Sequence, residues 1–123
     1  MAIKSYQDLL AWQKAMDYVV VCYGLSQNFP REEIYGLRSQ LRRSAVSIPS
    51  NIAEGYGRET RGEYIHFLGI ARGSLKESET QIILAFRLKY VTSDQMNHAL
   101  SLAQEVGKLL RNLIISLKPK TTP

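Results

Sequence analysis

The sequence predicts an all-α protein folded as an antiparallel up-down four-helix bundle. Four stretches carry apolar residues at helical spacing, and each begins or ends at a capping or helix-breaking residue. No stretch keeps the strict alternation of a half-buried strand. The chain has 123 residues, of which 45% are hydrophobic and 22% charged, an ordinary composition for one folded domain. We therefore expect a single domain over residues 1–123, with helices at about 6–27, 36–56, 61–89 and 93–117.

Residues 6–27 form the first expected helix. Ser5 is a candidate N-cap, with Asp8 as its capping-box partner. The main apolar stripe consists of Leu9, Trp12, Met16, Val19, Val20 and Tyr23. A second apolar face carries Tyr18, Val21 and Leu25. With further apolar residues in the third helix, Ile65 and Ile83, this face indicates a second buried surface and therefore self-association.

Residues 36–56 form the second expected helix, which contains a proline. Its single stripe consists of Leu37, Leu41, Ala45, Ile48 and Ile52. Pro49 removes a backbone hydrogen bond and clashes with the carbonyl four residues earlier, so we expect a kink or a break near Ala45 to Pro49. Three glycines then mark a turn: Gly55, Gly57 and Gly62.

The third and fourth expected helices, residues 61–89 and 93–117, both begin at a capping box. Thr60 with Glu63 opens the third, and Thr92 with Gln95 opens the fourth. The third stripe is Tyr64, Phe67, Leu68, Ala71, Leu75, Ile82, Ala85 and Phe86. The fourth is Met96, Ala99, Leu100, Ala103, Val106, Leu110, Leu113, Ile114 and Leu117. We expect residues 118–123 to be a frayed tail.

The residue types that enzymes use are scarce and scattered. His66 and His98 lie on different expected helices without metal-type partners, so no zinc site is predicted. Three serines surround Pro49 without a nucleophile elbow or a nearby histidine, and they are interpreted as helix-end and packing residues. The glycines of residues 55–58 follow a helix and match no phosphate-loop pattern, so a turn is predicted. We expect a non-enzymatic protein with no catalytic residue, metal or cofactor.

The cellular location is predicted from the scarcity of cysteine and of long apolar stretches. Cys22 is the one cysteine, which excludes an internal disulfide framework. No stretch approaches the roughly 20 uninterrupted apolar residues of a membrane span, and residues 1–10 lack a secretory apolar core. A cytoplasmic location without membrane insertion is expected.

Positive charge is concentrated in the last two thirds of the chain. The formal net charge is +5, whereas the stretch before residue 36 carries one more acid than bases. Residues 36–72 contain arginine as their only basic residue type, and its planar fork pairs with phosphate bidentately. Five arginines are therefore predicted to contact nucleic-acid phosphates: Arg42, Arg43, Arg58, Arg61 and Arg72.

The third helix segregates its charge. Four bases, Arg61, Arg72, Lys76 and Arg87, fall within roughly 80° of each other around it, as a phosphate-facing strip would. Helical charges are also commonly solvated or paired, and Glu79 interrupts the strip. Arg38, Arg42 or Arg72 could equally form ion pairs across a subunit interface. Both interpretations stay open at this point.

Three phrases carry a family resemblance. They are DLLAWQKA at 8–15, YGLRSQLRRSAVSIPSNIAEG at 35–55 and ARGSLKESETQ at 71–81. The chain resembles the four-helix-bundle proteins of 23S rRNA intervening sequences over about residues 5–117, with conservative departures at Ser44 and Ser78, where alanine and leucine are expected. It is also similar to the accessory variability determinant of diversity-generating retroelements. The resemblance implies a cytoplasmic bacterial bundle that assembles as a ring, a homopentamer, with nucleic acid and a reverse transcriptase-like protein as partners.

Two functional hypotheses follow from these observations. The first is a non-enzymatic, homo-oligomeric adaptor that associates with RNA or DNA. The alternative is a protein-interaction scaffold whose basic residues serve subunit or partner-protein contacts.

Overall fold

The computed structural model describes residues 2–119 and confirms the four-helix, all-α prediction. The helices are α1 (Leu10–Gln27), α2 (Leu37–Tyr56), α3 (Arg61–Arg87) and α4 (Ser93–Leu117), and no strand occurs among these residues. Two short 3-10 turns, η1 (Tyr6–Asp8) and η2 (Arg31–Glu33), precede α1 and α2. The predicted tail lies outside the described residues from position 120 onward.

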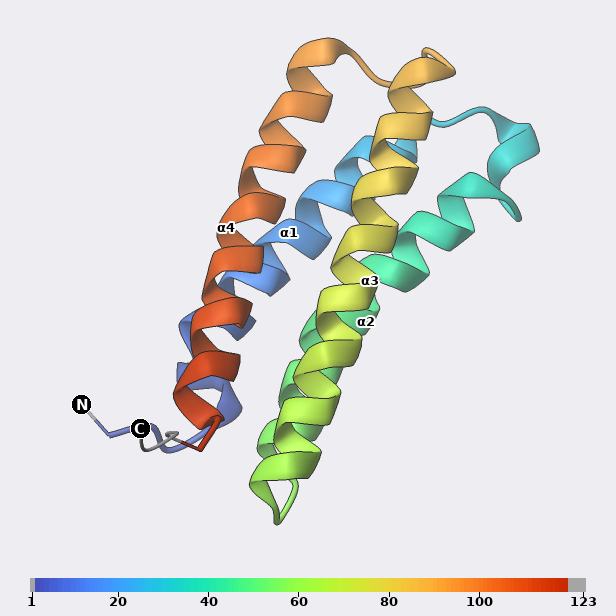
Figure 1. The fold of residues 1–123 in the computed structure, drawn as a ribbon. Coiled ribbons are helices and arrows are strands. Elements are labelled where there is room, and N and C mark those ends of the chain that lie inside the picture. Colours follow the sequence, from blue (N-terminus) through green and yellow to red (C-terminus); the bar gives the residue numbers. More distant parts are fainter. Residues whose placement is uncertain (1, 120–123) are drawn as a thin grey trace.

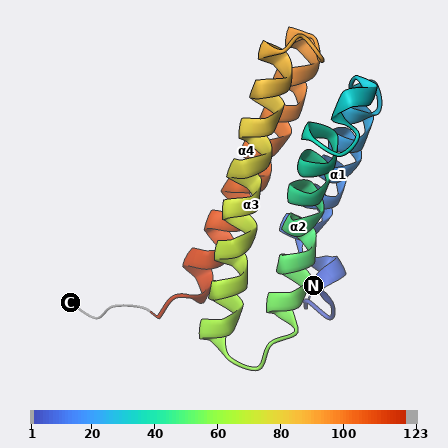
Figure 2. The ribbon, with the colours of Figure 1, turned by 90° about the vertical axis from the view of Figure 1, so that its right-hand side faces the viewer.

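Each helix packs against two others, so that α1, α2, α3 and α4 surround one core. Figure 2 separates the bundle into two sides, with α1 beside α2 and α3 beside α4. The core is formed mainly by aliphatic and alanine side chains from all four helices. Gly55 lies at the end of α2, where a Cβ atom would come within 2.9 Å of the Cβ of Phe67. A glycine there lets α2 and α3 approach closely before the turn that joins them.

The start of the first helix differs from the prediction. Ser5 and Asp8 do form a capping box, but it closes the 3-10 turn η1. Leu9 then adopts an extended conformation, with φ of −73° and ψ of 125°, and α1 begins only at Leu10. The predicted continuous helix over residues 6–27 is therefore split in two.

The face of α1 that enters the core was also predicted wrongly. The buried residues are Ala11, Ala15, Tyr18, Cys22 and Ser26, which recur at steps of three or four along one seam. Tyr18 is fully buried within the protomer, whereas Val20 of the predicted main stripe is 70% exposed. Four of the five seam residues are small, so the neighbouring helices can approach α1 closely there. Of the predicted main stripe, Leu9 is buried and Trp12 and Val19 are half-buried, whereas Met16, Val20 and Tyr23 are exposed.

Tyr18 spans the core from α1 to α3. Its hydroxyl lies 2.7 Å from Oγ of Ser78, which itself donates to the Leu75 carbonyl at 2.7 Å. Because the one Ser78 proton is engaged in that bond, Tyr18 donates and Ser78 accepts. Burial raises the pKa of the Tyr18 phenol far above its ordinary value, and burial raises the pKa of the Cys22 thiol to about 12. Both groups stay protonated and act as core side chains.

Pro49 bends α2 without breaking it. The helix runs without interruption from Leu37 to Tyr56 with Pro49 buried inside it. Figure 1 shows α2 changing direction about midway along its length. The predicted kink is confirmed, and the missing N–H and the ring of the proline supply its physical cause.

A polar clamp joins the two sides of the bundle at one end. The Glu33 carboxylate in the α1–α2 connection accepts hydrogen bonds from the Leu37 amide at 3.0 Å and from the Tyr90 hydroxyl at 2.9 Å. Tyr90 belongs to the α3–α4 connection, where its ring also packs against Phe29. These hydrogen bonds hold the pKa of Glu33 below its usual value, and the bond to Glu33 raises the pKa of Tyr90.

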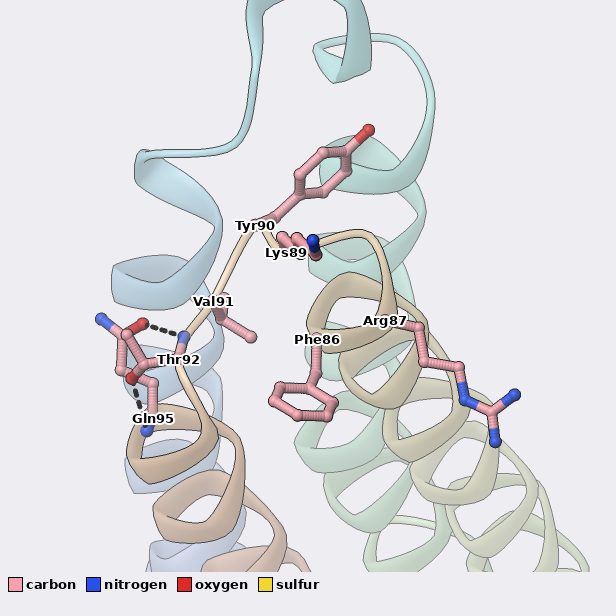
Figure 3. Close-up of a pocket in the computed structure, with 7 residues that line it drawn as sticks. All are labelled: Phe86, Arg87, Lys89, Tyr90, Val91, Thr92 and Gln95. Atoms are coloured by element: carbon pink, nitrogen blue, oxygen red, sulfur yellow. Dashed lines mark hydrogen bonds between the residues drawn. The ribbon is translucent and has the colours of Figure 1, made fainter.

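The α3–α4 connection is a tight helix-ending turn. Lys89 has a φ of 67°, and the Lys89 and Tyr90 amides donate to the Phe86 and Ala85 carbonyls at 2.9 and 2.8 Å. This is the Schellman pattern, here with lysine at the left-handed position that glycine favours. α3 therefore ends at Arg87, two residues before the prediction. Figure 3 shows the predicted Thr92–Gln95 capping box that follows the turn.

Candidate nucleic-acid interface

Arg42, one of the five predicted phosphate ligands, makes its contacts within the protomer. Its Nε donates to Oγ of Ser26 at 2.8 Å, and a terminal nitrogen donates to the Tyr23 carbonyl at 3.2 Å. The guanidinium also lies 4.4 Å from the centre of the Tyr23 ring. Arg42 thus connects the last turn of α1 to α2, and a phosphate would have to compete with these contacts.

Arg58 is also engaged inside the protomer. Its Nε lies 3.4 Å from a carboxylate oxygen of Glu54, and its Nη1 lies 3.8 Å from one of Glu63. The guanidinium stacks over Phe67 at 4.8 Å from the ring centre. Two carboxylates and an aromatic ring therefore surround this arginine at the α2–α3 turn, which lowers its capacity to bind an anion.

Arg43, Arg61 and Arg72 are more available. The Arg61 and Arg72 side chains are exposed, and neither makes an ion pair or hydrogen bond within residues 2–119. Arg43 makes a single long hydrogen bond, 3.4 Å to Oγ of Ser39. Arg61 precedes Arg72 by eleven residues, or about 16 Å along the helix axis. The structure does not bring the five predicted arginines together on one surface.

A cationic groove lies between α3 and α4 and contains only Arg72 of the predicted five. It encloses about 380 Å³. Arg72, Leu75 and Lys76 line it from α3, and Gln104, Gly107, Lys108 and Arg111 line it from α4. Four of these seven residues are basic and none is acidic. We call this the α3/α4 groove.

The antiparallel packing sets cations opposite one another across the α3/α4 groove. Leu75 faces Gly107, since a Cβ atom on Gly107 would lie 3.5 Å from a Leu75 methyl group. One turn away, Arg72 of α3 is therefore level with Arg111 of α4. In the other direction Lys76 lies between the levels of Gln104 and Lys108. Basic side chains of α3 and α4 therefore lie on both sides of a groove floor that has no charged residue.

Lys108 and Arg111 are the residues that the sequence analysis missed. Gln104, Lys108 and Arg111 lie four and three residues apart, so their common helical face was visible in the sequence. What the sequence did not contain is the register of α4 against α3, which brings this face beside Arg72 and Lys76. Arg87, the last base of the predicted strip, lies at the α3–α4 connection.

A second groove lies on the opposite side of the bundle, between α1 and α2. It encloses about 290 Å³ and is lined by Trp12, Met16, Val19, Val46, Pro49 and Ser50. Val20 and Tyr23 stand exposed on the same helix, 70% and 40% accessible. We call this the α1/α2 groove. It contains no charged residue, so it presents an apolar surface where the α3/α4 groove presents a cationic one.

A third hollow, of about 440 Å³, lies at the α3–α4 connection and is drawn in Figure 3. The backbone amide and the hydroxyl oxygen of Thr92 are occupied by the capping box with Gln95, and the Tyr90 hydroxyl by Glu33. In Figure 3 the Arg87 side chain points away from Phe86 and from the capping box. The polar groups of this hollow do not converge on a common point.

Comparison with known proteins identifies the family. The family model described as 23S rRNA-intervening sequence protein matches residues 7–112. The chain belongs to this family. A solved structure from Bacteroides thetaiotaomicron VPI-5482, described as a protein with unknown function from the S23 ribosomal protein family, is 27% identical with a TM-score of 0.80. The match covers 86% of this chain and 96% of that one. No curated protein matches.

The family assignment confirms the sequence resemblance, and neither the family description nor that of the solved structure names a catalytic activity. Both departures from the expected family pattern are buried and polar: Ser44 lies 2.7 Å from the Gln81 side chain, and Ser78 accepts from Tyr18. Each joins two helices of the core. Within residues 2–119, no helix is long and apolar enough to cross a membrane.

Proposed function

We propose that this family member is a non-enzymatic, homo-oligomeric adaptor that associates with nucleic acid in the cytoplasm. The observation that carries the proposal is the surplus of unpaired cations. Residues 2–119 contain fifteen lysines and arginines, and only Lys14, Arg58 and Lys76 lie within 4.0 Å of a carboxylate. Unpaired surface cations bind phosphates and release the counterions condensed on a nucleic acid.

The family is named after an RNA sequence, as 23S rRNA-intervening sequence protein, and this name is compatible with the proposal. The partner is an RNA or a DNA, and an adaptor of this kind would present it to a protein such as a reverse transcriptase-like enzyme.

Self-association is the second part of the proposal. The α1/α2 groove and the exposed Met16, Val20 and Tyr23 leave an apolar face without a partner in the protomer. Covering such a face with another copy removes it from water. The resemblance to ring-forming bundles favours a pentamer, in which each copy would contribute its cations to a common assembly.

Equilibrium binding against salt tests the proposal. Fluorescence anisotropy of the full chain with labelled RNA and DNA oligonucleotides should give an affinity that falls steeply between about 50 and 200 mM salt. Affinity that is flat with salt, or no binding at low salt, would contradict it.

The alternative is a protein-interaction scaffold whose basic residues serve subunit or partner-protein contacts. The apolar α1/α2 groove, which suits a protein surface, favours it. Replacing Arg42 and Arg72 together and weighing the particle separates the two functions. Loss of the oligomer with unchanged nucleic-acid affinity supports the scaffold, whereas weaker affinity in an intact oligomer supports the adaptor.

A further inference from the structure

We propose that the α3/α4 groove binds the phosphate backbone of a nucleic acid through cations on both of its walls and does not read the bases. This inference rests on the proposed function and assigns it to one surface of the protein. The ligand class is the sugar-phosphate backbone of a nucleic acid.

The charges of the groove support an anionic ligand. Arg72 of α3 and Arg111 of α4 stand at one level, and Lys76 and Lys108 extend the same charge one turn further. Like charges brought together repel, and this repulsion is relieved when an anion lies between them. Among residues 2–119, the one carboxylate within 4.0 Å of these four bases is that of Glu79, 3.4 Å from a Lys76 ammonium whose side chain is 77% exposed. The Glu79 side chain is 20% exposed, but the Lys76 ammonium stays accessible to solvent and can also contact a phosphate.

The shape of the groove supports a ligand that lies along it. Gly107 forms part of the floor, and a methyl group there would make only an ordinary 3.5 Å contact with Leu75. Packing against α3 therefore does not require glycine at this position, although glycine within a helix costs about 1 kcal/mol relative to alanine. The missing side chain keeps the floor low between the two cationic walls. Arg72 and Lys76 are four residues apart, so the charges repeat about every 6 Å along the groove.

The lining explains why bases would not be read. None of the seven lining residues is aromatic, so no side chain in the groove can stack on a base. Gln104 is the one uncharged polar side chain, and a single amide gives little discrimination among bases. Contacts to phosphate oxygens position a strand without carrying sequence information. We therefore expect the affinity to depend strongly on salt concentration and only weakly on base sequence.

The test compares two double variants that remove the same charge. Arg72→Gln with Arg111→Gln removes the two facing cations of the groove, and Lys4→Gln with Arg31→Gln removes two exposed bases outside it. The full chain is titrated with a labelled single-stranded RNA of mixed sequence at several salt concentrations. Far-ultraviolet circular dichroism and thermal melting verify that each variant is folded.

The groove variant should bind more weakly, and the slope of log affinity against log salt should fall by about 0.7 for every phosphate that the variant no longer neutralises. The control should keep the wild-type slope. A second groove variant, Lys76→Gln with Lys108→Gln, should reduce the slope in the same direction. Replacing the mixed RNA by poly(U) should leave the wild-type affinity within about threefold, a difference below about 1 kcal/mol.

Four outcomes would overturn the inference. A groove variant with the wild-type slope would overturn this assignment while leaving the proposed function standing, since the protein would still bind RNA elsewhere. An equal reduction of the slope in the control would assign binding to net charge instead of to the groove. A preference of more than about tenfold for one sequence would contradict binding without base readout. Failure of the wild-type protein to bind at all would overturn the proposed function as well.

Discussion

The α1/α2 and α3/α4 grooves are built alike and lined oppositely. Both lie between adjacent antiparallel helices, on opposite sides of the bundle, and they enclose about 290 and 380 Å³. The first is lined by Trp12, Met16 and other apolar residues, the second by four bases. In an up-down bundle, core packing restricts which residues can occupy the inward face of each helix. The residues that line the outward grooves between helices are not restricted in this way. One architecture can therefore present two chemically different surfaces.

The largest expected effect comes from charging the apolar side. Met16→Glu with Val20→Glu should dissociate the oligomer, because burying two unpaired carboxylates in an interface is strongly unfavourable. Light scattering should show a wild-type particle of several times the 14.0 kDa of one chain, five times for a pentamer, and a variant near the mass of one chain. Ile115→Glu with Leu88→Glu, which charges exposed apolar residues on the other side, is the matched control. An unchanged mass in the α1/α2 variant would contradict self-association through this side.

Arg42 should affect stability and leave the RNA salt dependence unchanged. Arg42→Gln removes the Nε hydrogen bond to Ser26 and the contacts to Tyr23, and we expect a loss of about 2 kcal/mol in the free energy of unfolding. Urea denaturation measures the loss, and the RNA titration measures the slope. Arg38→Gln, one turn away, is the comparison variant. A fall in the slope would place Arg42 among the phosphate ligands after all.

Tyr18 tests whether the two sides are coupled through the core. Tyr18→Phe removes the hydrogen bond to Ser78 and should lower the free energy of unfolding by about 1 kcal/mol. The melting temperature would fall by roughly 2–5 °C. Tyr35→Phe is the matched control, because that side chain is 96% exposed. Equal melting temperatures of the Tyr18 variant and the wild type would show that the hydrogen bond contributes nothing net.

Gly107→Ala should produce a small gain. Alanine is favoured over glycine within a helix by about 1 kcal/mol, and the added methyl group makes an ordinary contact with Leu75. We expect a slightly higher free energy of unfolding by urea denaturation and a modestly weaker RNA affinity, since the methyl group raises the groove floor. Gly24→Ala, in α1, serves as a reference because no atom beyond its own stretch of helix lies within 4 Å of its Cβ position. Destabilisation specific to Gly107→Ala would mean that the two helices require glycine to pack.

The smallest expected effect is a pH dependence of the clamp between the two sides. The pKa of Glu33 in the folded protein lies below its ordinary value of 4.5. Its contribution is therefore fully present above pH 4.5 and is lost as the pH falls through the folded-state pKa. Glu33→Gln should melt with a weaker dependence on pH between about 3 and 6 than the wild type. Equal dependence in both proteins would exclude Glu33 as the titrating group.

The stabilising hydrogen bond between Tyr90 and Glu33 should also be lost at alkaline pH. Its pKa is raised above the ordinary value of 10.0 by the hydrogen bond to Glu33, so its contribution is present below pH 10.0 and is lost as the pH rises through the folded-state pKa. Tyr90→Phe should remove this alkaline dependence in the same melting experiment.

Local sequence was sufficient to predict the four helices, the capping residues Thr60 and Thr92, and the bend at Pro49. These features depend on residues within a few positions of each other, so they can be derived from spacing and side-chain chemistry. Arg72 was also correctly placed on a charged face of α3. The three sequence phrases at 8–15, 35–55 and 71–81 were sufficient to identify the family.

The buried face of α1 and the grouping of the cations depend instead on how the helices pack. Counting large apolar residues selected Met16 and Val20, but Ala11, Ala15 and Cys22 face the core because small side chains allow close helix packing. Likewise, Arg72 and Arg111 are 39 positions apart and meet only through the register of α3 against α4. That register is set by the fit of many core side chains at once, which no local pattern encodes.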